Sequence, residues 1–321
     1  MLTRRAYLIE PGKLEVKETE LKLQLQHDEL LLEVLACGLC TWELNHFQGR
    51  IGEAPMSLGH EFVGKIIEMG SSVSSFEPGD VVTGLPGALD GFSEYMTVAA
   101  KNCEKIAPGI KPEHALGEPL KCVVTVLRGA APEAGDYGVV IGAGPMGIWA
   151  VQALAGNSLS ALIAVDVDEE KLKLAAQYGA THTINPATVD TVEAIREITR
   201  GHMADFVIEG TGNTKVINDG IKMLKAGRGR LVLMSSYKSA AESLDVVGMV
   251  ERSAEIRVPH PGYSLNEQDD LRRAVQLLNK GVFRLEGIVS HKFSLDQIQL
   301  AFESLEKRPA GYLKGVVIPK L

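Results

Sequence analysis

The chain has 321 residues, enough for about two domains, each with its own core. Its composition, 45% hydrophobic and 23% charged, is typical of a globular protein. A net charge of −8 without a Lys/Arg cluster argues against nucleic acid as a partner. No apolar run reaches the ~20 residues of a membrane helix, the opening residues are too charged for a secretory signal, and four cysteines are too few for a disulfide scaffold. We therefore expect a cytoplasmic protein with no membrane partner.

The first third of the chain predicts a β-rich domain. Short stretches rich in β-branched residues are separated by Gly, Pro and Asp, which is typical of strands joined by turns. Pro78-Gly79-Asp80 predicts one such turn. The expected strands are residues 14–21, 29–38, 61–70 and 79–85.

From Tyr137 onward, strands and helices alternate at short spacing, which predicts a parallel sheet with helices on both faces. Asp168 can cap the N-terminus of a helix over residues 169–178, and Gly179 can end it. The other expected strands are 137–142, 160–166, 181–184, 204–210 and 229–234, and the other helices are 145–155, 189–199 and 213–224.

The pattern changes again near Arg257. The expected elements there are a helix over 269–281, a strand over 287–293, a helix over 295–307 and a strand over 314–319. We expect this tail to pack back onto the first domain, so that the α/β region is an insertion. The predicted domains are residues 1–121 with 262–321, and residues 122–261.

A glycine-rich loop, Gly142-Ala143-Gly144-Pro145-Met146-Gly147, follows the first strand of the α/β region and opens a helix. Glycines there allow a tight turn, close approach of the backbone to a pyrophosphate, and close packing of helix on strand. The helix N-terminus offers free N–H groups to phosphates. The context predicts a dinucleotide site containing Gly142, Gly144, Pro145, Met146 and Gly147; a purely structural turn is the alternative.

Asp166 ends the second strand about two dozen residues after Gly142, where an acid accepts hydrogen bonds from the adenosine ribose. Its charge repels a 2′-phosphate and no Arg follows it, so NAD is predicted in preference to NADP. The predicted cofactor-binding set is completed by residues in the next helix and after later strands: Lys171, Gly210, Thr211 and Ser235.

A candidate metal site lies in the first domain, where Cys37-Gly38-Leu39-Cys40 is followed by His60-Glu61. A CxxC can be a redox pair or half of a zinc knuckle. No second CxxC follows and no helix is expected to begin at Cys40, which disfavours both. One cysteine, one histidine and nearby carboxylates suit an open catalytic zinc site with three protein ligands. A buried His60 without a metal is the alternative that spacing leaves open.

Together these motifs resemble the zinc-containing medium-chain dehydrogenase/reductase superfamily, in the group of sorbitol, threonine and alcohol dehydrogenases. The resemblance implies a Rossmann doubly wound parallel sheet inserted in a GroES-like β-barrel catalytic domain. The matching stretches fall in family order over nearly the full length: ACGLCTWELNHFQG, LGHEFVGKIIEMG, PGDVV, GFSEYMTV, GEPL, IGAGPMG, VDVDEEKL, IEGTG and KGVVIP.

The resemblance implies that Cys40 and His60 ligate one catalytic Zn²⁺ per subunit, with Glu61 or Glu118 as the third ligand. The sequence does not choose between the two acids. Cys37 is then a core residue or one that lies behind the metal ligands. The family's lobe of four closely spaced cysteines for a structural zinc is missing, since residues 84–92 bridge the gap directly.

Two departures from the family pattern concern the chemistry. Trp42 stands where a Ser or Thr usually begins a proton relay, and Glu43 follows it in place of Asp. Thr41, His46 or a water molecule is the candidate substitute, although the sequence favours both residues as ordinary loop residues over a catalytic role. Lys121 stands where a small side chain is usual, and it can pair with a nearby acid or meet the substrate.

The expected activity is zinc-dependent, NAD-linked oxidation of a secondary alcohol (polyol, sugar or cyclitol) to a ketone, or the reverse. One alternative is a zinc-free quinone or alkene reductase of the same superfamily, which the complete ligand set disfavours. The other is a non-catalytic NAD-binding protein, which Trp42 favours. The resemblance also implies a homodimer or homotetramer formed through the edge of the cofactor-domain sheet, with residues 254–258 as the edge strand.

Overall fold

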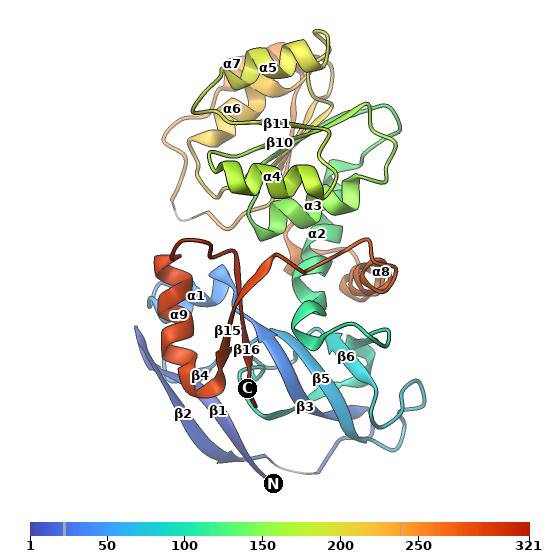
Figure 1. Cartoon of the computed structure of the whole chain (residues 1–321), viewed down its shortest axis with the longest axis vertical. Helices are drawn as coiled ribbons and strands as arrows, with labels where there is room; N and C mark the ends of the chain where they lie inside the picture. The colour runs from blue at the N-terminus through green and yellow to red at the C-terminus, as the bar shows by residue number, and fades with distance from the viewer. Residues whose placement is uncertain (22–23, 238) are drawn as a thin grey trace. The chain divides into compact units, whose positions relative to one another are not determined.

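The computed structural model describes residues 1–21, 24–237 and 239–321, which form two compact units (Figure 1). Unit 1 combines Met1–Lys121 with Gln268–Leu321, and unit 2 is the continuous stretch Cys122–Glu267. The tail of the chain thus folds with the first third. None of the helices in the described ranges is both long and apolar enough to span a bilayer.

Unit 1 contains two sheets, which carry the GroES-like fold. A small antiparallel sheet has the order β2-β1-β4, and the larger sheet has the order β15-β16-β3-β5-β6-β8, with β7 also paired to β3. The strands are β1 (Leu2–Glu10), β2 (Lys13–Glu20), β3 (Glu29–Gly38), β4 (Met56–Ser57), β5 (Glu61–Met69), β6 (Val81–Gly84), β7 (Tyr95–Ala99), β8 (Cys103–Lys105), β15 (Val289–Ser294) and β16 (Lys314–Ile318). The strands expected from sequence correspond to β2, β3, β5, β6, β15 and β16; the others were not expected.

Helix packing joins the early and late segments of the sequence that make up unit 1. Phe302 contacts the rings of Phe47 and Phe92, with centroids 5.3 and 5.7 Å apart, so α9 and α1 share one apolar core. This packing fixes the segment that carries Cys40. The helices are α1 (Thr41–Phe47), α2 (Gly117–Ala130, which continues into unit 2), α8 (Glu267–Asn279) and α9 (Ile298–Lys307), with short 3₁₀ turns η1 (Ala100–Asn102), η2 (Pro112–His114) and η4 (Leu295–Gln297).

Unit 2 is a six-stranded parallel sheet in the order β11-β10-β9-β12-β13-β14. Counted along the unit, this is the order 3-2-1-4-5-6 of dinucleotide-binding folds, and the predicted Rossmann class is confirmed. Helices lie on both sides of the sheet in Figure 1. The elements are β9 (Tyr137–Ile141), α3 (Pro145–Leu154), β10 (Ala161–Val165), α4 (Glu169–Gln177), β11 (His182–Ile184), α5 (Thr191–Ile198), β12 (Phe206–Glu209), α6 (Val216–Met223), β13 (Arg230–Leu233), α7 (Val246–Arg252), β14 (Glu255–Arg257) and η3 (Pro261–Tyr263).

The signals that bound α4 act as the sequence predicts. The Asp168 carboxylate accepts hydrogen bonds from the backbone N–H groups of Glu170 and Lys171. Gly179, directly after the last helical turn, has φ +117°, a conformation that side chains rarely adopt. Local chemistry therefore determines this helix at both ends.

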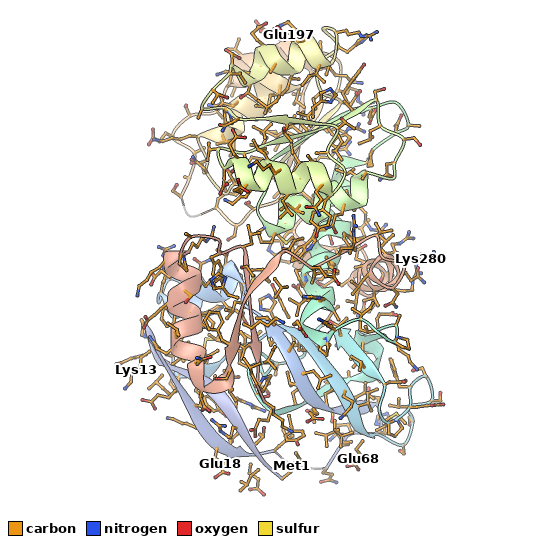
Figure 2. All side chains as sticks on the ribbon, viewed as in Figure 1. Met1, Lys13, Glu18, Glu68, Glu197 and Lys280 are labelled. Atoms are coloured by element: carbon orange, nitrogen blue, oxygen red, sulfur yellow. The ribbon has the colours of Figure 1, made fainter. Side chains whose placement is uncertain are left out.

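Charged side chains mostly lie on the outside of both units. Figure 2 shows Lys13, Glu18, Glu68, Glu197 and Lys280 pointing outward, and all five are exposed. The exceptions are informative, because buried charges are costly unless they are paired or bind a metal. Those that lie in unit 1 around the candidate metal site are Glu43, Glu61, Lys121 and Lys314.

Candidate metal centre and nucleotide site

Cys40 lies at the start of helix α1, which corrects the expectation that no helix begins there. Its sulfur accepts the Trp42 backbone N–H at 3.5 Å and so acts as the N-cap. The helix has only seven residues and lacks the usual Ser, Thr, Asp or Asn cap, which is why the sequence did not reveal it. Cys37 is fully buried, and burial raises the pKa of its thiol well above the ordinary value, so it remains an unreactive core residue.

Two glycines make room for the neighbouring pair His60 and Glu61. Gly38 lies opposite Glu61 in the β3–β5 ladder, and a Cβ on Gly38 would come 2.0 Å from Glu61 Oε2. Gly59 has φ +115°, and a Cβ there would come 2.3 Å from the Phe92 nitrogen. The middle of the CxxC motif is therefore small because a carboxylate occupies the adjacent space.

Three potential metal ligands converge in unit 1. One donor atom each from Cys40, His60 and Glu61 lies within 4.8 Å of the other two, and among the residues described this is the one such group of three or more. Sulfur, imidazole nitrogen and carboxylate oxygen form a donor set suited to zinc.

Glu43 orients the histidine of this group. Its Oε1 lies 3.0 Å from His60 Nδ1 and also accepts the Gly59 backbone N–H at 2.6 Å. Burial lowers the pKa of His60, but the Glu43 carboxylate and the Cys40 sulfur outweigh it and hold the pKa well above the ordinary value. A carboxylate on the far nitrogen fixes the imidazole so that Nε2 is available to a metal. The sequence marked Glu43 as a departure without suggesting this role.

Glu61 is paired with a cation from the other end of the sequence. Lys314 Nζ lies 2.6 and 2.8 Å from its two carboxylate oxygens, and both side chains are buried. Burial lowers the pKa of Lys314, yet the Glu61 carboxylate raises it further, so the lysine stays charged. Lys314 was not expected from the sequence, where its one signal is a lysine at the start of the apolar final strand.

The buried Lys121 and the partly buried Glu118 form a second acid–base pair one helical turn apart on α2. Lys121 Nζ lies 3.2 Å from Glu118 Oε1, while Glu118 Oε2 lies 3.8 Å from His60 Nε2. Of the two roles expected for Lys121, the structure therefore contains the pairing with a nearby acid. Glu118 is next to the metal group without belonging to its three closest donors.

The charges of this cluster balance with a divalent cation. Glu61 is neutralised by Lys314, and Glu118 by Lys121. The charges that remain are a Cys40 thiolate and the Glu43 carboxylate, with His60 neutral when it ligates through Nε2. A doubly charged ion brings the sum to zero, so the residues present fit zinc both in donor type and in charge.

The glycine loop of unit 2 has the geometry that a dinucleotide needs. Gly142 has φ +94°, and Gly144 caps helix α3, which begins at Pro145. A Cβ on Gly147 would come 1.8 Å from the Gly142 carbonyl oxygen, so only glycine lets the helix start this close to the strand. Met146 lies in the first turn of the same helix.

Asp166 lies beside this loop at the end of β10. Its carboxylate accepts the backbone N–H of Ala143 at 2.7 Å and that of Asp168 at 3.0 Å. The acid that the sequence assigned to the ribose is thus held against the glycine loop by the backbone.

Family models match most of the chain. The "Zinc-binding dehydrogenase" model matches residues 145–280, and the "Alcohol dehydrogenase GroES-like domain" model matches residues 26–108. The chain belongs to the zinc-containing medium-chain dehydrogenase/reductase superfamily. This membership agrees with both folds and supports zinc and a nicotinamide nucleotide as the cofactors of this dehydrogenase.

Curated relatives of this dehydrogenase match over nearly their full length. L-threonine 3-dehydrogenase of Pyrococcus abyssi is 29% identical (88% of this chain, 89% of the relative), and sorbitol dehydrogenase of Bacillus subtilis is 27% identical (92% and 91%). Among solved structures, a candidate zinc-binding dehydrogenase of Sinorhizobium meliloti bound to NADP is 25% identical with a TM-score of 0.87 (99% and 100%). The 2R,3R-butanediol dehydrogenase of Bacillus subtilis, 23% identical with a TM-score of 0.86 (99% and 99%), shares the fold.

The relay candidates of this dehydrogenase lie apart from one another. The Thr41 hydroxyl accepts a hydrogen bond from Arg308 at 3.3 Å, at the surface. His46 is buried, and neither of its ring nitrogens makes a hydrogen bond of good geometry to the described residues, the Ile51 backbone supplying at most a weak one. Trp42 contacts the rings of both His46 and His60, with centroids 4.5 and 5.3 Å apart. An indole, not a hydroxyl, therefore connects this helix to the metal group.

The remaining cofactor candidates lie after β12 and β13 and on α4. A Cβ on Gly210 would come 2.5 Å from the end of the Met234 side chain, and Ser235 lies within 4 Å of where Gly212 would carry one. Thr211 donates its backbone N–H to the fully buried Glu209, which also bonds the Tyr237 hydroxyl. Lys171 pairs with Asp168 at 3.6 Å. Glu209 belongs to the IEGTG stretch that the sequence offers as a lining of the nicotinamide pocket, whereas Tyr237 was not expected.

Proposed function

We propose that this chain is a zinc-dependent, NAD-linked dehydrogenase that interconverts a secondary alcohol of polyol, sugar or cyclitol type and its ketone. The observation that carries the proposal is the convergence of Cys40, His60 and Glu61 within 4.8 Å. A zinc ion there supplies Lewis acidity that lowers the pKa of a substrate hydroxyl. A nicotinamide nucleotide held by unit 2 would accept the hydride.

The chain's own residues contribute orientation and charge. The Glu43 carboxylate, 3.0 Å from His60 Nδ1, orients the imidazole so that Nε2 can ligate the metal. Lys314 neutralises Glu61 and Lys121 neutralises Glu118, so the site carries no net charge once it holds a divalent ion and a neutral alcohol. A neutral hydroxylated substrate suits that balance better than an anion.

The substrate class is supported by the names of relatives. They include sorbitol dehydrogenase of Bacillus subtilis and D-xylulose reductase of Saccharomyces cerevisiae, the latter 25% identical over 99% of this chain and 98% of the relative. Threonine dehydrogenases match equally well, so the amino-acid alcohol threonine belongs in any substrate panel. Asp166 supports NAD, whereas the similar Sinorhizobium structure contains NADP.

Metal analysis tests the proposal first. We expect about one zinc per chain in the wild-type protein and little in Cys40→Ala, with the buried Cys103→Ala as the matched control that retains the metal. About two zinc ions per chain would mean a second, structural site. A metal-free protein that zinc does not reload would favour a zinc-free reductase or a non-catalytic NAD-binding protein.

We further propose that Glu61 supplies the third ligand and that Glu118 acts beside it. The support is the short mutual distance within the three-donor group, which includes Glu61 and excludes Glu118. Glu61→Gln should therefore lower zinc affinity more than Glu118→Gln. The assignment would be rejected if a competition assay with a zinc-binding dye showed that Glu118→Gln lowers zinc affinity as much as Glu61→Gln does, or more.

We propose a homodimer formed through the open edge of the unit 2 sheet, with a tetramer as the higher assembly. In the described chain β14 is the last strand of its sheet, and nearby helix α7 exposes Val246, Val247 and Val250. An uncovered strand edge beside exposed apolar side chains favours association. Val247→Lys with Val250→Lys should yield a monomer by light scattering; an unchanged mass would reject this surface.

A further inference from the structure

The His46 imidazole is a buried polar group outside the metal cluster whose hydrogen-bonding capacity is not filled. Its residue is 7% exposed, neither Nδ1 nor Nε2 makes a hydrogen bond of good geometry to the described residues, and the Ile51 backbone supplies at most a weak one. Burying an imidazole without partners costs free energy, and such groups in native proteins usually face a ligand or water.

A cavity adjoins this ring. Its volume is about 390 Å³, which is in the range of small-molecule sites. His46 shares its wall with mainly apolar side chains, including Leu8, Pro11, Ile51 and Met56. Glu10 and Glu53, both exposed, line it as well. All of these residues belong to unit 1.

Two glycines allow the chain to close around the cavity. Gly49 and Gly52 have φ +68° and +71°. A Cβ on Gly52 would come 2.4 Å from His46 Nδ1, and one on Gly49 would come 2.8 Å from Pro11. The backbone therefore approaches the histidine directly, and the space beside the ring stays free of side chains from these two positions.

Trp42 connects the cavity wall to the metal group. Its indole contacts the His46 ring at 4.5 Å and the His60 ring at 5.3 Å, both edge to face. The two imidazoles therefore lie no more than about 10 Å apart. That separation is within the span of a chain of several carbons with a hydrogen bond at its far end.

The lining indicates which chemical group binds. A neutral imidazole offers one N–H donor and one nitrogen acceptor, and a hydroxyl can form a hydrogen bond with either. The two acids on the wall disfavour an anionic ligand, and the apolar side chains suit a carbon backbone. A neutral, hydroxylated carbon chain fits these features.

We propose that this cavity binds the distal hydroxyl end of a polyol substrate, with His46 as its hydrogen-bond partner and Trp42 as the wall between the two ends. The proposal rests on the proposed function. It gives His46 a role in specificity in place of a proton relay, since no hydrogen bond of the described chain leads from His46 to the metal ligands. A site that bonds a substrate hydroxyl rejects analogues lacking it, because its own polar group is then left unpaired.

Kinetics with a long and a short substrate test the proposal. In His46→Leu we expect the ratio of kcat/KM for a pentitol or hexitol to that for butan-2-ol to fall about tenfold or more, mostly through KM. His46→Asn, which keeps one donor and one acceptor, should recover part of the ratio. The exposed His27→Leu is the matched control. An unchanged ratio, or an equal loss of kcat for both substrates as a relay would give, overturns the inference.

A binding measurement separates this inference from the proposed function. Ring ¹⁵N signals of His46, assigned by their loss in His46→Leu, should shift when a hexitol is added to the wild-type protein without NAD. If no alcohol is oxidised yet these signals shift, the dehydrogenase proposal fails and the polyol-binding cavity stands. If alcohols are oxidised and the signals stay fixed at saturating hexitol, the cavity proposal fails alone.

Discussion

Replacing Lys314 with methionine should expose how strongly the metal centre depends on its buried ion pair. Glu61 is 1% and Lys314 7% exposed, and their charged atoms lie 2.6 Å apart. Removing one partner of such a pair leaves an uncompensated buried charge and costs about 3–5 kcal/mol. For a domain of this size that lowers Tm by about 6–20 °C. A bound divalent ion would compensate the charge of Glu61. The decrease in Tm caused by Lys314→Met should therefore be larger in chelator-treated protein than in zinc-loaded protein.

The assay is thermal unfolding of Lys314→Met, Glu61→Gln and the double variant, each with and without chelator. The double variant removes both charges. Its free energy of unfolding should therefore fall by about 2 kcal/mol or more less than the sum of the decreases in the two single variants. Lys105→Met is the matched control, because the Lys105 side chain that pairs with Asp80 is 54% exposed and its loss should cost less than about 1 kcal/mol. The reasoning is refuted if Lys314→Met costs no more than this control, or if the double variant shows no recovery.

Three further perturbations test other parts of the structure. Glu43→Gln should weaken zinc affinity about 10- to 100-fold, measured by dye competition, because it loosens His60; an unchanged affinity contradicts that role. Asp166→Asn keeps an acceptor for the Ala143 N–H but removes the charge, so the kcat/KM ratio of NADP to NAD should rise about tenfold or more, and a constant ratio would refute the ribose assignment. Hydrogen bonds from Lys320 and Lys65 lower the pKa of Glu33, so its stabilisation is present above its ordinary value of 4.5 and is lost as the pH falls below that value. Glu33→Gln should therefore flatten the acid side of a stability–pH curve, and an unaltered slope would count against the pairing.

Local signals made much of the fold predictable. The Asp168 cap and the Gly179 terminator act on residues within one turn, and the glycines of the nucleotide loop act on a single strand–helix junction. Such effects depend on a few consecutive residues, so they can be predicted from the sequence. Helix α1 was not predicted, because its cap is the sulfur of Cys40, and a cysteine in this motif indicates a metal ligand more than a helix start.

The partners of the candidate ligands could not be predicted in the same way. Lys314 and Glu61 are separated by 253 residues, and no spacing rule links them. Glu43 is only 17 residues from His60, yet their contact depends on how α1 meets the turn before β5. A single sequence offers the residue types of a site, whereas the pairing of its charges is decided by tertiary packing.

The pairing of Glu61 with Lys314 also sets an order of events during synthesis. All three metal-group residues leave the ribosome before unit 2, and the lysine follows only after unit 2 is complete. At typical translation speeds the 253 residues between the two partners take about 13–50 s to make. Throughout that interval strand β16 is missing from the large sheet, and the Glu61 carboxylate lacks the cation that allows its burial. The continuous unit can therefore fold on the nascent chain, while the unit with the metal ligands is completed last.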